Sequence, residues 1–132
     1  MTSNGHGTSA LAFDVTLRGG ANELRSAATM RSAGTLVIFG PSGAGKTLTL
    51  RALAGLTRPT SGSIRQFGRV LYDGGSGIDV RPQERRVGYV PQHAALFPHL
   101  SVRDNVAFGV RTGDRAARVG EVLTQLDLTA LA

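Results

Sequence analysis

Residues 40–47 read Gly40-Pro41-Ser42-Gly43-Ala44-Gly45-Lys46-Thr47. An apolar run, Leu36 to Phe39, precedes them, and the apolar spacing of a helix follows from Leu48 to Ala54. The stretch matches the pattern GxxxxGK[ST], in which a glycine-rich loop aims several backbone N–H groups at a polyanion. Its three glycines carry no Cβ to obstruct that approach, and glycine adopts the positive φ angles that such a turn uses. The stretch therefore predicts a phosphate-binding loop that joins a strand to a helix.

Two side chains at the end of this loop have separate tasks in the pattern. Lys46 reaches the β- and γ-phosphates of a triphosphate, and the Thr47 hydroxyl ligates a Mg²⁺ that bridges the same phosphates. The positive end of the helix that starts near Lys46 adds to the attraction. Lys46 is also the only lysine in the chain, and an arginine-rich composition explains that scarcity but not the position of the lysine.

Composition narrows the function classes. The 132 residues make one ordinary domain, and 15 Lys plus Arg against 9 Asp plus Glu give a formal charge of +6. This positive charge could suit nucleic acid, anionic lipid or phosphates. The scattered arginines and the few aromatic residues argue against nucleic acid. Cysteine is absent, which excludes disulfides and thiolate metal sites and fits a reducing cytoplasm. No apolar run approaches the roughly 20 residues that span a bilayer, so membrane association would need a partner.

The order of expected elements follows from local patterns. We expect residues 1–10, which are small, polar and glycine-rich, to be a disordered leader. Residues 35–39 are apolar throughout, which favours a buried strand of a parallel sheet, whereas residues 64–80 favour antiparallel pairing. Strands are expected at 11–17, 24–30, 35–39, 64–72 with a break at Gly68, 78–80 and 85–90. Helices are expected at 46–56, 102–108 and 115–126.

The two later helices have clear starting signals. Ser101-Val102-Arg103-Asp104 matches a capping box, which makes Asp104 a structural residue. Asp114 is placed as the N-cap of the last helix. The inner face of that helix is expected to consist of Ala116, Val119, Val122, Leu123 and Leu126.

A second constellation begins after residue 85. The run from Arg86 to Val102, RVGYVPQHAALFPHLSV, resembles the Q-loop region of ATP-binding cassette (ABC) transporter subunits. Together with the phosphate loop, nearly all of residues 36–109 follows the order and spacing of that family. The resemblance implies an α/β fold, with residues 11–132 as the N-terminal portion of the nucleotide-binding domain. That portion is an incomplete P-loop NTPase core with a mostly parallel sheet, an antiparallel β region and the start of the helical subdomain.

The resemblance also implies roles for individual residues. Residues 40–47 would bind ATP, and Gln92 would be the Q-loop glutamine that contacts Mg²⁺ and the water near the γ-phosphate. The site expected from the family therefore has Lys46 and Gln92 as catalytic residues and Thr47 and Gln92 as metal ligands. His93 and His99 do not inherit the role of the family's switch histidine, which comes much later in the sequence.

Partners and location follow from the same resemblance. Ala94 to Ser101, which includes Phe97 and Pro98, would contact a transmembrane permease subunit. A second ATPase subunit would complete a homodimer, and the complex would lie on the cytoplasmic face of the cell membrane. Within the family, the sequence at residues 68–73, 77–78 and 85–90 looks most like that of the ATPase subunits of molybdate importers. The ATPase subunits of sulfate, iron and sugar importers share much of the Q-loop sequence.

Some features of the family are absent from the 132 residues. They contain no LSGGQ signature, no Walker B strand with its Asp and catalytic Glu, and no switch histidine. Phe13 is the candidate for stacking on adenine, although a buried position in a strand is favoured. Two hypotheses stay open: the N-terminal part of an importer ATPase for molybdate or a similar oxyanion, and a truncated, non-catalytic nucleotide-binding or permease-binding fragment. Under both, the 132 residues alone are expected not to hydrolyse ATP.

Overall fold

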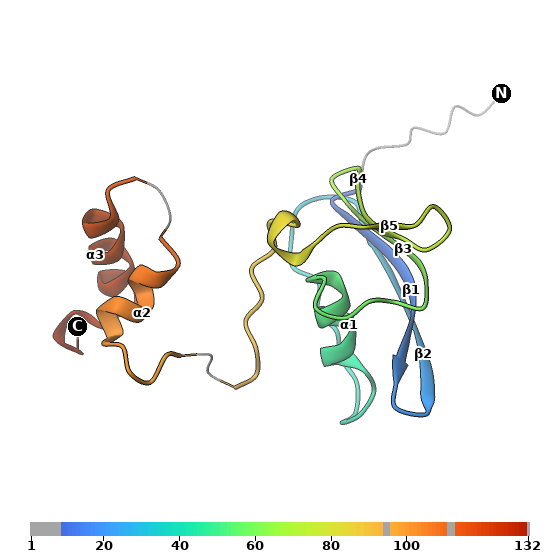
Figure 1. Cartoon of the computed structure of the whole chain (residues 1–132), viewed down its shortest axis with the longest axis horizontal. Coiled ribbons are helices and arrows are strands. Elements are labelled where there is room, and N and C mark those ends of the chain that lie inside the picture. Colours follow the sequence, from blue (N-terminus) through green and yellow to red (C-terminus); the bar gives the residue numbers. More distant parts are fainter. Residues whose placement is uncertain (1–8, 94–95, 111–112, 132) are drawn as a thin grey trace. The chain divides into compact units, whose positions relative to one another are not determined.

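The computed structural model describes residues 9–93, 96–110 and 113–131. The chain forms two compact units, Met1–Tyr89 and Val90–Ala132 (Figure 1). The first unit contains the β-strands and helix α1, and the second contains helices α2 and α3. Residues 1–8, which make up most of the predicted leader, lie outside the described residues.

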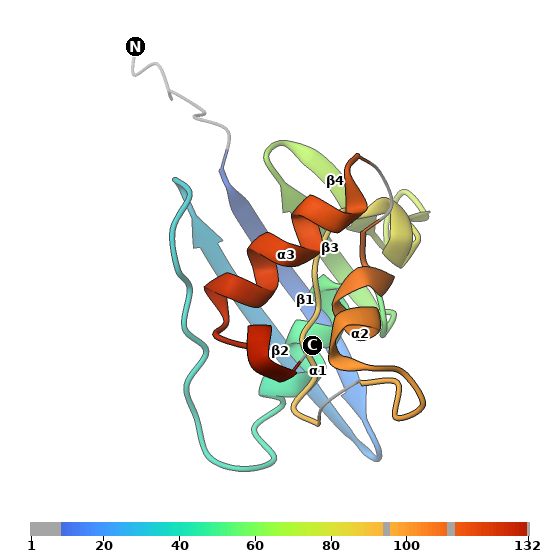
Figure 2. The same cartoon turned by 90° about the vertical axis from the view of Figure 1, so that its left-hand side faces the viewer.

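An antiparallel sheet dominates the first unit. Its five strands have the order β2-β1-β3-β4-β5 and pair antiparallel throughout. The strands are β1 (Leu11–Gly19), β2 (Asn22–Met30), β3 (Ser61–Gln66), β4 (Arg69–Asp73) and β5 (Ile78–Asp79). Figure 2 shows β1 and β2 side by side as the long hairpin, which pairs from Leu11 with Met30 to Gly19 with Asn22. The predicted strands at 11–17 and 24–30 are therefore confirmed.

The predicted break at Gly68 is a tight turn between β3 and β4. Phe67 and Gly68 both have positive φ angles, 46° and 77°. A two-residue hairpin turn with two positive φ angles matches the right-handed twist of the strands that it joins. The expected antiparallel pairing of this region is confirmed.

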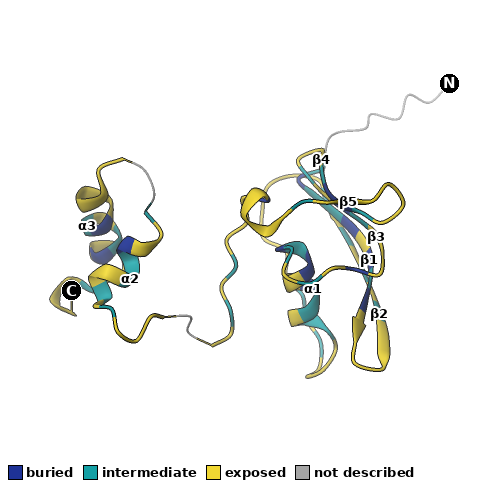
Figure 3. Cartoon of the chain, viewed as in Figure 1, coloured by how far each residue is buried: buried dark blue, intermediate teal, exposed yellow. Residues whose placement is uncertain are grey.

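Helix α1 (Lys46–Leu53) packs on one face of the sheet. Alternate residues of β1, namely Phe13, Val15 and Leu17, are buried members of the core. Figure 3 shows buried stretches, in dark blue, on the sheet and on α1. The other buried members of this core are Ala52, Ile64, Leu71 and Tyr72. Phe13 is only 5% exposed, so its ring belongs to the core, as the sequence favoured, and not to a nucleotide surface.

Two strand predictions are wrong. Residues 35–39 form no strand, and Val37 and Phe39 are 76% and 97% exposed. A strand requires a hydrogen-bonded neighbour, and no described strand pairs with this segment, so an apolar sequence alone did not produce one. Residues 85–90 also form no strand, because the short helix η1 (Pro82–Glu84) turns the chain and Arg85 inserts into the interior. The α/β class is confirmed, but all strand pairs among the described residues are antiparallel.

The second unit is a pair of helices with its own small core. Helix α2 is Val102–Phe108 and α3 is Arg115–Gln125, followed by the short helix η2 (Thr129–Leu131). Ala107, Val119 and Leu123 are the buried residues between them. Two residues of the predicted inner face of α3, Ala116 and Leu126, are exposed. The short helix α2 covers only a narrow stripe of α3, which includes Val119 and Leu123. No helix in the described ranges has the length and apolarity that a bilayer crossing requires.

Candidate functional site

The phosphate loop is built by the backbone. Gly43 and Gly45 adopt left-handed φ angles of 80° and 83°, which a side chain disfavours. Gly45 is the N-cap of α1 and offers no capping side chain. The N–H groups in the first turn of α1 therefore have neither an intrahelical acceptor nor a capping partner. This arrangement of free donors at a positive helix end fits a phosphate group.

Lys46 completes this arrangement from the first position of α1. Its Nζ donates hydrogen bonds to the carbonyl oxygens of Gly40 and Pro41, at 2.8 and 2.7 Å. The backbone N–H of Ala44 donates to Pro41 at 3.2 Å, which closes the loop. The ammonium group thus lies across the loop that the sequence predicts to hold phosphate. Thr47 follows on the exposed side of the helix start.

The β1–β2 hairpin borders the phosphate loop. A cavity of about 240 Å³ lies between them and is lined by Gly19, Asn22, Glu23, Leu24, Gly43, Ala44, Gly45 and Leu48. Leu24 lies so close to Gly45 that a Cβ on Gly45 would be 2.0 Å from the Leu24 Cδ2. The hairpin therefore supports the loop and forms one wall of the space beside it.

Two residues that fix α1 were missed by the sequence analysis. Thr49 is buried, and its hydroxyl donates to the Gly45 carbonyl at 3.1 Å, which ties the first turn of the helix to the loop. Arg85 is buried at the other end of α1. The helical position of Thr49 one turn after Gly45 was a usable signal, but the sequence around Arg85 indicated only a strand.

Gln92 belongs to the second unit and is exposed. Its contact with Mg²⁺ near the phosphate loop of the first unit stays a prediction. Ala94 and Ala95, the first residues of the predicted permease contact, lie outside the described residues. The remainder of that segment, residues 96–101, is described and leads directly into α2.

Asn105 holds the described part of this segment in place. Its Oδ1 accepts from the Phe97 N–H at 2.9 Å, and its Nδ2 donates to the carbonyls of Phe97, Leu100 and Ser101. The Phe97 ring also packs against Phe108 of α2, with 4.5 Å between ring centroids. A single amide side chain thus shapes the loop before α2.

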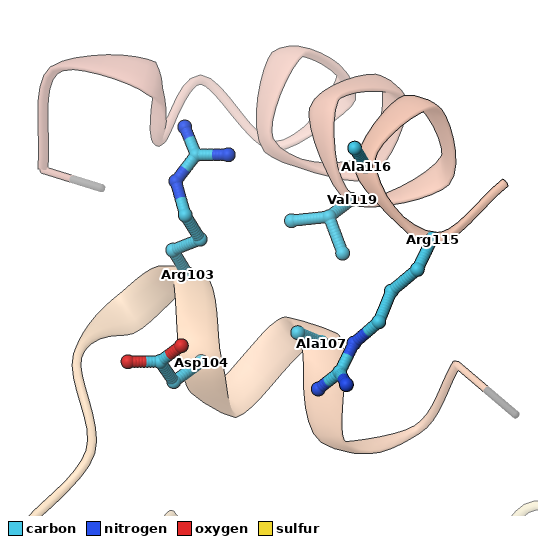
Figure 4. Close-up of a pocket in the computed structure, with 6 residues that line it drawn as sticks. All are labelled: Arg103, Asp104, Ala107, Arg115, Ala116 and Val119. Carbon is cyan, nitrogen blue, oxygen red and sulfur yellow. The ribbon is translucent and has the colours of Figure 1, made fainter.

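Another cavity, of about 380 Å³, lies between α2 and α3 (Figure 4). Ala107, Ala116 and Val119 give it an apolar lining, and Arg103 and Arg115 flank it. Its carboxylate, Asp104, is engaged in the N-cap of α2, where Ser101 Oγ donates to it at 2.7 Å. The lining holds no paired acid and base, so the phosphate loop is the better candidate site.

The loop at residues 40–47 leads directly into α1, which is the loop-to-helix order that the pattern GxxxxGK[ST] predicts. The sequence profile of the ABC transporter family matches residues 25–132, so the chain belongs to this family.

Its relatives include bacterial molybdenum import ATP-binding proteins named ModC. The protein of Rhodospirillum rubrum is 48% identical over 124 residues, which cover 92% of this chain and 33% of the relative. That of Paramagnetospirillum magneticum is 46% identical over 101 residues, covering 74% and 28%. That of Escherichia coli K12 is 52% identical over 82 residues, covering 62% and 23%. The chain thus spans about a third or less of the length of these relatives.

Proposed function

We propose that this chain is the ATP-binding part of the ATPase subunit of an ABC importer. The observation that carries the proposal is the loop at residues 40–47. It combines two left-handed glycines, the Lys46 ammonium and an uncapped start of α1 in one place. The family match covers this loop and extends to the end of the chain.

The residues present fit a Mg²⁺–ATP complex. Lys46 would bind the β- and γ-phosphates, backbone N–H groups of the loop and of the first turn of α1 would face them, and the Thr47 hydroxyl would contribute a ligand to Mg²⁺. When bound there, Mg²⁺ would supply neutralisation of charge on the phosphate oxygens. Gln92 would act with Lys46 as a catalytic residue and with Thr47 as a metal ligand. Lys46 needs only to exchange two carbonyl partners for phosphate oxygens, because its Nζ already lies at the loop.

The complete importer involves further subunits. Residues 94–101 contact the permease, a second copy of the ATPase subunit completes a homodimer, and the complex lies on the cytoplasmic face of the cell membrane. Molybdate or a similar oxyanion is the transported solute, which the names of the relatives support. No nucleic-acid partner belongs to this function.

The alternative is a truncated, non-catalytic fragment that binds a nucleotide or a permease. The 132 residues contain neither an LSGGQ signature nor a Walker B strand. This absence would favour the alternative if the gene product ended at residue 132. Turnover of Mg-ATP by the 132 residues alone would refute the expectation that they do not hydrolyse ATP.

A binding titration with Mg-ATP tests the proposed function. In the full-length gene product, Lys46→Ala removes charge-assisted hydrogen bonds to phosphate, so affinity is expected to fall roughly ten- to a hundredfold. Arg31→Ala is the matched control, because it removes one exposed positive charge outside the loop. Equal affinity of Lys46→Ala and the unaltered protein would overturn the proposal.

A further inference from the structure

Arg85 is the largest fully buried side chain among the described residues, and it is 1% exposed. Its guanidinium group donates to four acceptors. Nε donates to the Val80 carbonyl at 2.8 Å, and Nη1 donates to the carbonyls of Ala52 and Leu53 at 2.9 and 3.1 Å. Nη2 donates to Asp79 Oδ1 at 3.1 Å. An unpaired buried charge would be strongly destabilising. These hydrogen bonds are therefore what allows the guanidinium group to be buried.

Two of these acceptors are the last-turn carbonyls of α1. The final carbonyls of a helix lack intrahelical partners and carry partial negative charge. Arg85 donates hydrogen bonds to two of these carbonyls and places its positive charge at the negative end of the helix. The Ala52 carbonyl also accepts from the Gly55 N–H at 3.0 Å. Burial lowers the pKa of Arg85, and the charge of Asp79 raises it in part.

Gly55 is shaped to admit this guanidinium. It has a φ angle of 81°, and a Cβ there would lie 2.7 Å from Arg85 Nε. Any side chain at position 55 would displace the arginine or the helix end. The contact between Arg85 and α1 is therefore a close fit that depends on a glycine.

The segment that carries Arg85 is itself fixed to the sheet. The N–H of Val80 donates to the Leu71 carbonyl in β4 at 2.9 Å. Arg69 Nη1, also from β4, donates to the Glu84 carbonyl at 3.0 Å. Arg85 thus links the carboxyl end of α1 to the sheet, while the amino end of the same helix presents Lys46 and Thr47.

We propose that Arg85 is a positioning residue for phosphate binding, which holds α1 so that its amino end aligns with the phosphate loop. The inference rests on the proposed function. Helix α1 has eight residues and is about 12 Å long, so it moves as a rigid rod. Release of its carboxyl end shifts Lys46 and the first-turn N–H groups together, which weakens phosphate binding without any direct contact between Arg85 and the ligand.

The test compares Arg85→Met, Arg85→Lys and Gly55→Ala in the full-length gene product. Gly55→Ala keeps the arginine but forces it away from the helix end. Arg51→Met is the matched control, because Arg51 lies in the last turn of α1 and is exposed. Affinities for Mg-ATP and for inorganic triphosphate are measured well below the unfolding temperature of each variant, which is recorded in parallel.

Arg85→Met and Gly55→Ala are expected to weaken both ligands by about the same factor, tenfold or more, because the phosphate site is what moves. Arg85→Lys keeps the charge and some of the donors, so it is expected to restore part of the affinity. Arg51→Met is expected to bind as the unaltered protein does. If Arg85→Met does not fold, Arg85→Lys and Gly55→Ala give the answer.

A purely structural role for Arg85 would lower the unfolding temperature and leave both affinities unchanged. That result, in folded Arg85→Lys and Gly55→Ala, would overturn this inference and leave the proposed function intact. An unaltered protein that binds neither ligand would overturn both.

Discussion

Gly45 shows why the phosphate loop tolerates so little change. Its φ angle is 83°, and the side chain of Leu24 from β2 occupies the space where a Cβ would point. Gly43 has a similar φ angle of 80° but faces open space. Both positions therefore require a left-handed backbone. Gly45 alone also requires the absence of a side chain, because Leu24 packs against it.

Gly45→Ala is expected to destabilise the protein more than Gly43→Ala. Each alanine in a left-handed conformation costs about 1–2 kcal/mol. Overpacking against Leu24 adds about 1–3 kcal/mol at Gly45. Chemical unfolding of the two variants measures the difference. Equal losses of stability would show that Leu24 simply moves aside.

Arg85 illustrates what the sequence did not reveal about the site. The loop at 40–47 could be predicted because its chemistry depends on residues that are adjacent in the chain. Arg85 contacts α1 over a separation of 33 residues, and no local pattern marks a surface-type residue for burial. The predicted pairing of Gln92 with Mg²⁺ likewise depends on residues far apart in the sequence, and it stays a prediction.

Helices α2 and α3 begin where the sequence predicts because caps are local. Ser101 Oγ accepts the Asp104 N–H at 3.1 Å, and Asp114 Oδ1 accepts the Ala117 N–H at 3.1 Å. The prediction of a strand at 35–39 was wrong because strand formation is not local. A strand requires a hydrogen-bonded partner elsewhere in the chain. Helix α1 ends at Leu53 and not at the predicted residue 56, because Gly55 turns left-handed and Arg85 takes the final carbonyls.

Ser101→Ala is expected to cost about 1 kcal/mol, the usual loss when an N-cap hydroxyl is removed. The effect should appear as faster hydrogen exchange in α2, because the unit is small and α2 has only seven residues. Ser101→Thr keeps the hydroxyl and serves as the control. Unchanged exchange in Ser101→Ala would mean that packing, not the cap, fixes the start of α2.

The turn between β4 and β5 makes the stability of the sheet depend on pH. The N–H groups of Ser76 and Gly75 donate to Asp73, and with Arg65 they hold the pKa of Asp73 below its ordinary value. The pKa of Asp73 is lower in the folded state than in the unfolded state, where it is about 4. The stabilisation is therefore complete above the unfolded-state pKa and is lost as the pH falls through the folded-state pKa.

Asp73→Asn is therefore expected to flatten the fall in stability below about pH 4. Urea unfolding of the unaltered protein and the variant between neutral and acidic pH measures this. The two proteins should converge at the acidic end, where Asp73 is protonated in both states. Parallel profiles over the whole range would rule out a stabilising role for the ionised carboxylate.

The chain divides into two units, one with the candidate phosphate loop and one with the segment that is proposed to contact a permease. Each unit has a separate core, with Leu17 and Ile64 central to the first and Leu123 central to the second. Leu36, Val37 and Phe39 keep exposed apolar side chains, and they are 41%, 76% and 97% exposed.

Hydrogen exchange of the full-length protein with and without Mg-ATP tests the central claim most directly, because it locates the nucleotide. Protection is expected at residues 40–48 and not in α3, and it should disappear in Lys46→Ala. Protection confined to other segments, or protection of the loop that survives Lys46→Ala, would contradict the assignment of this loop as the nucleotide site.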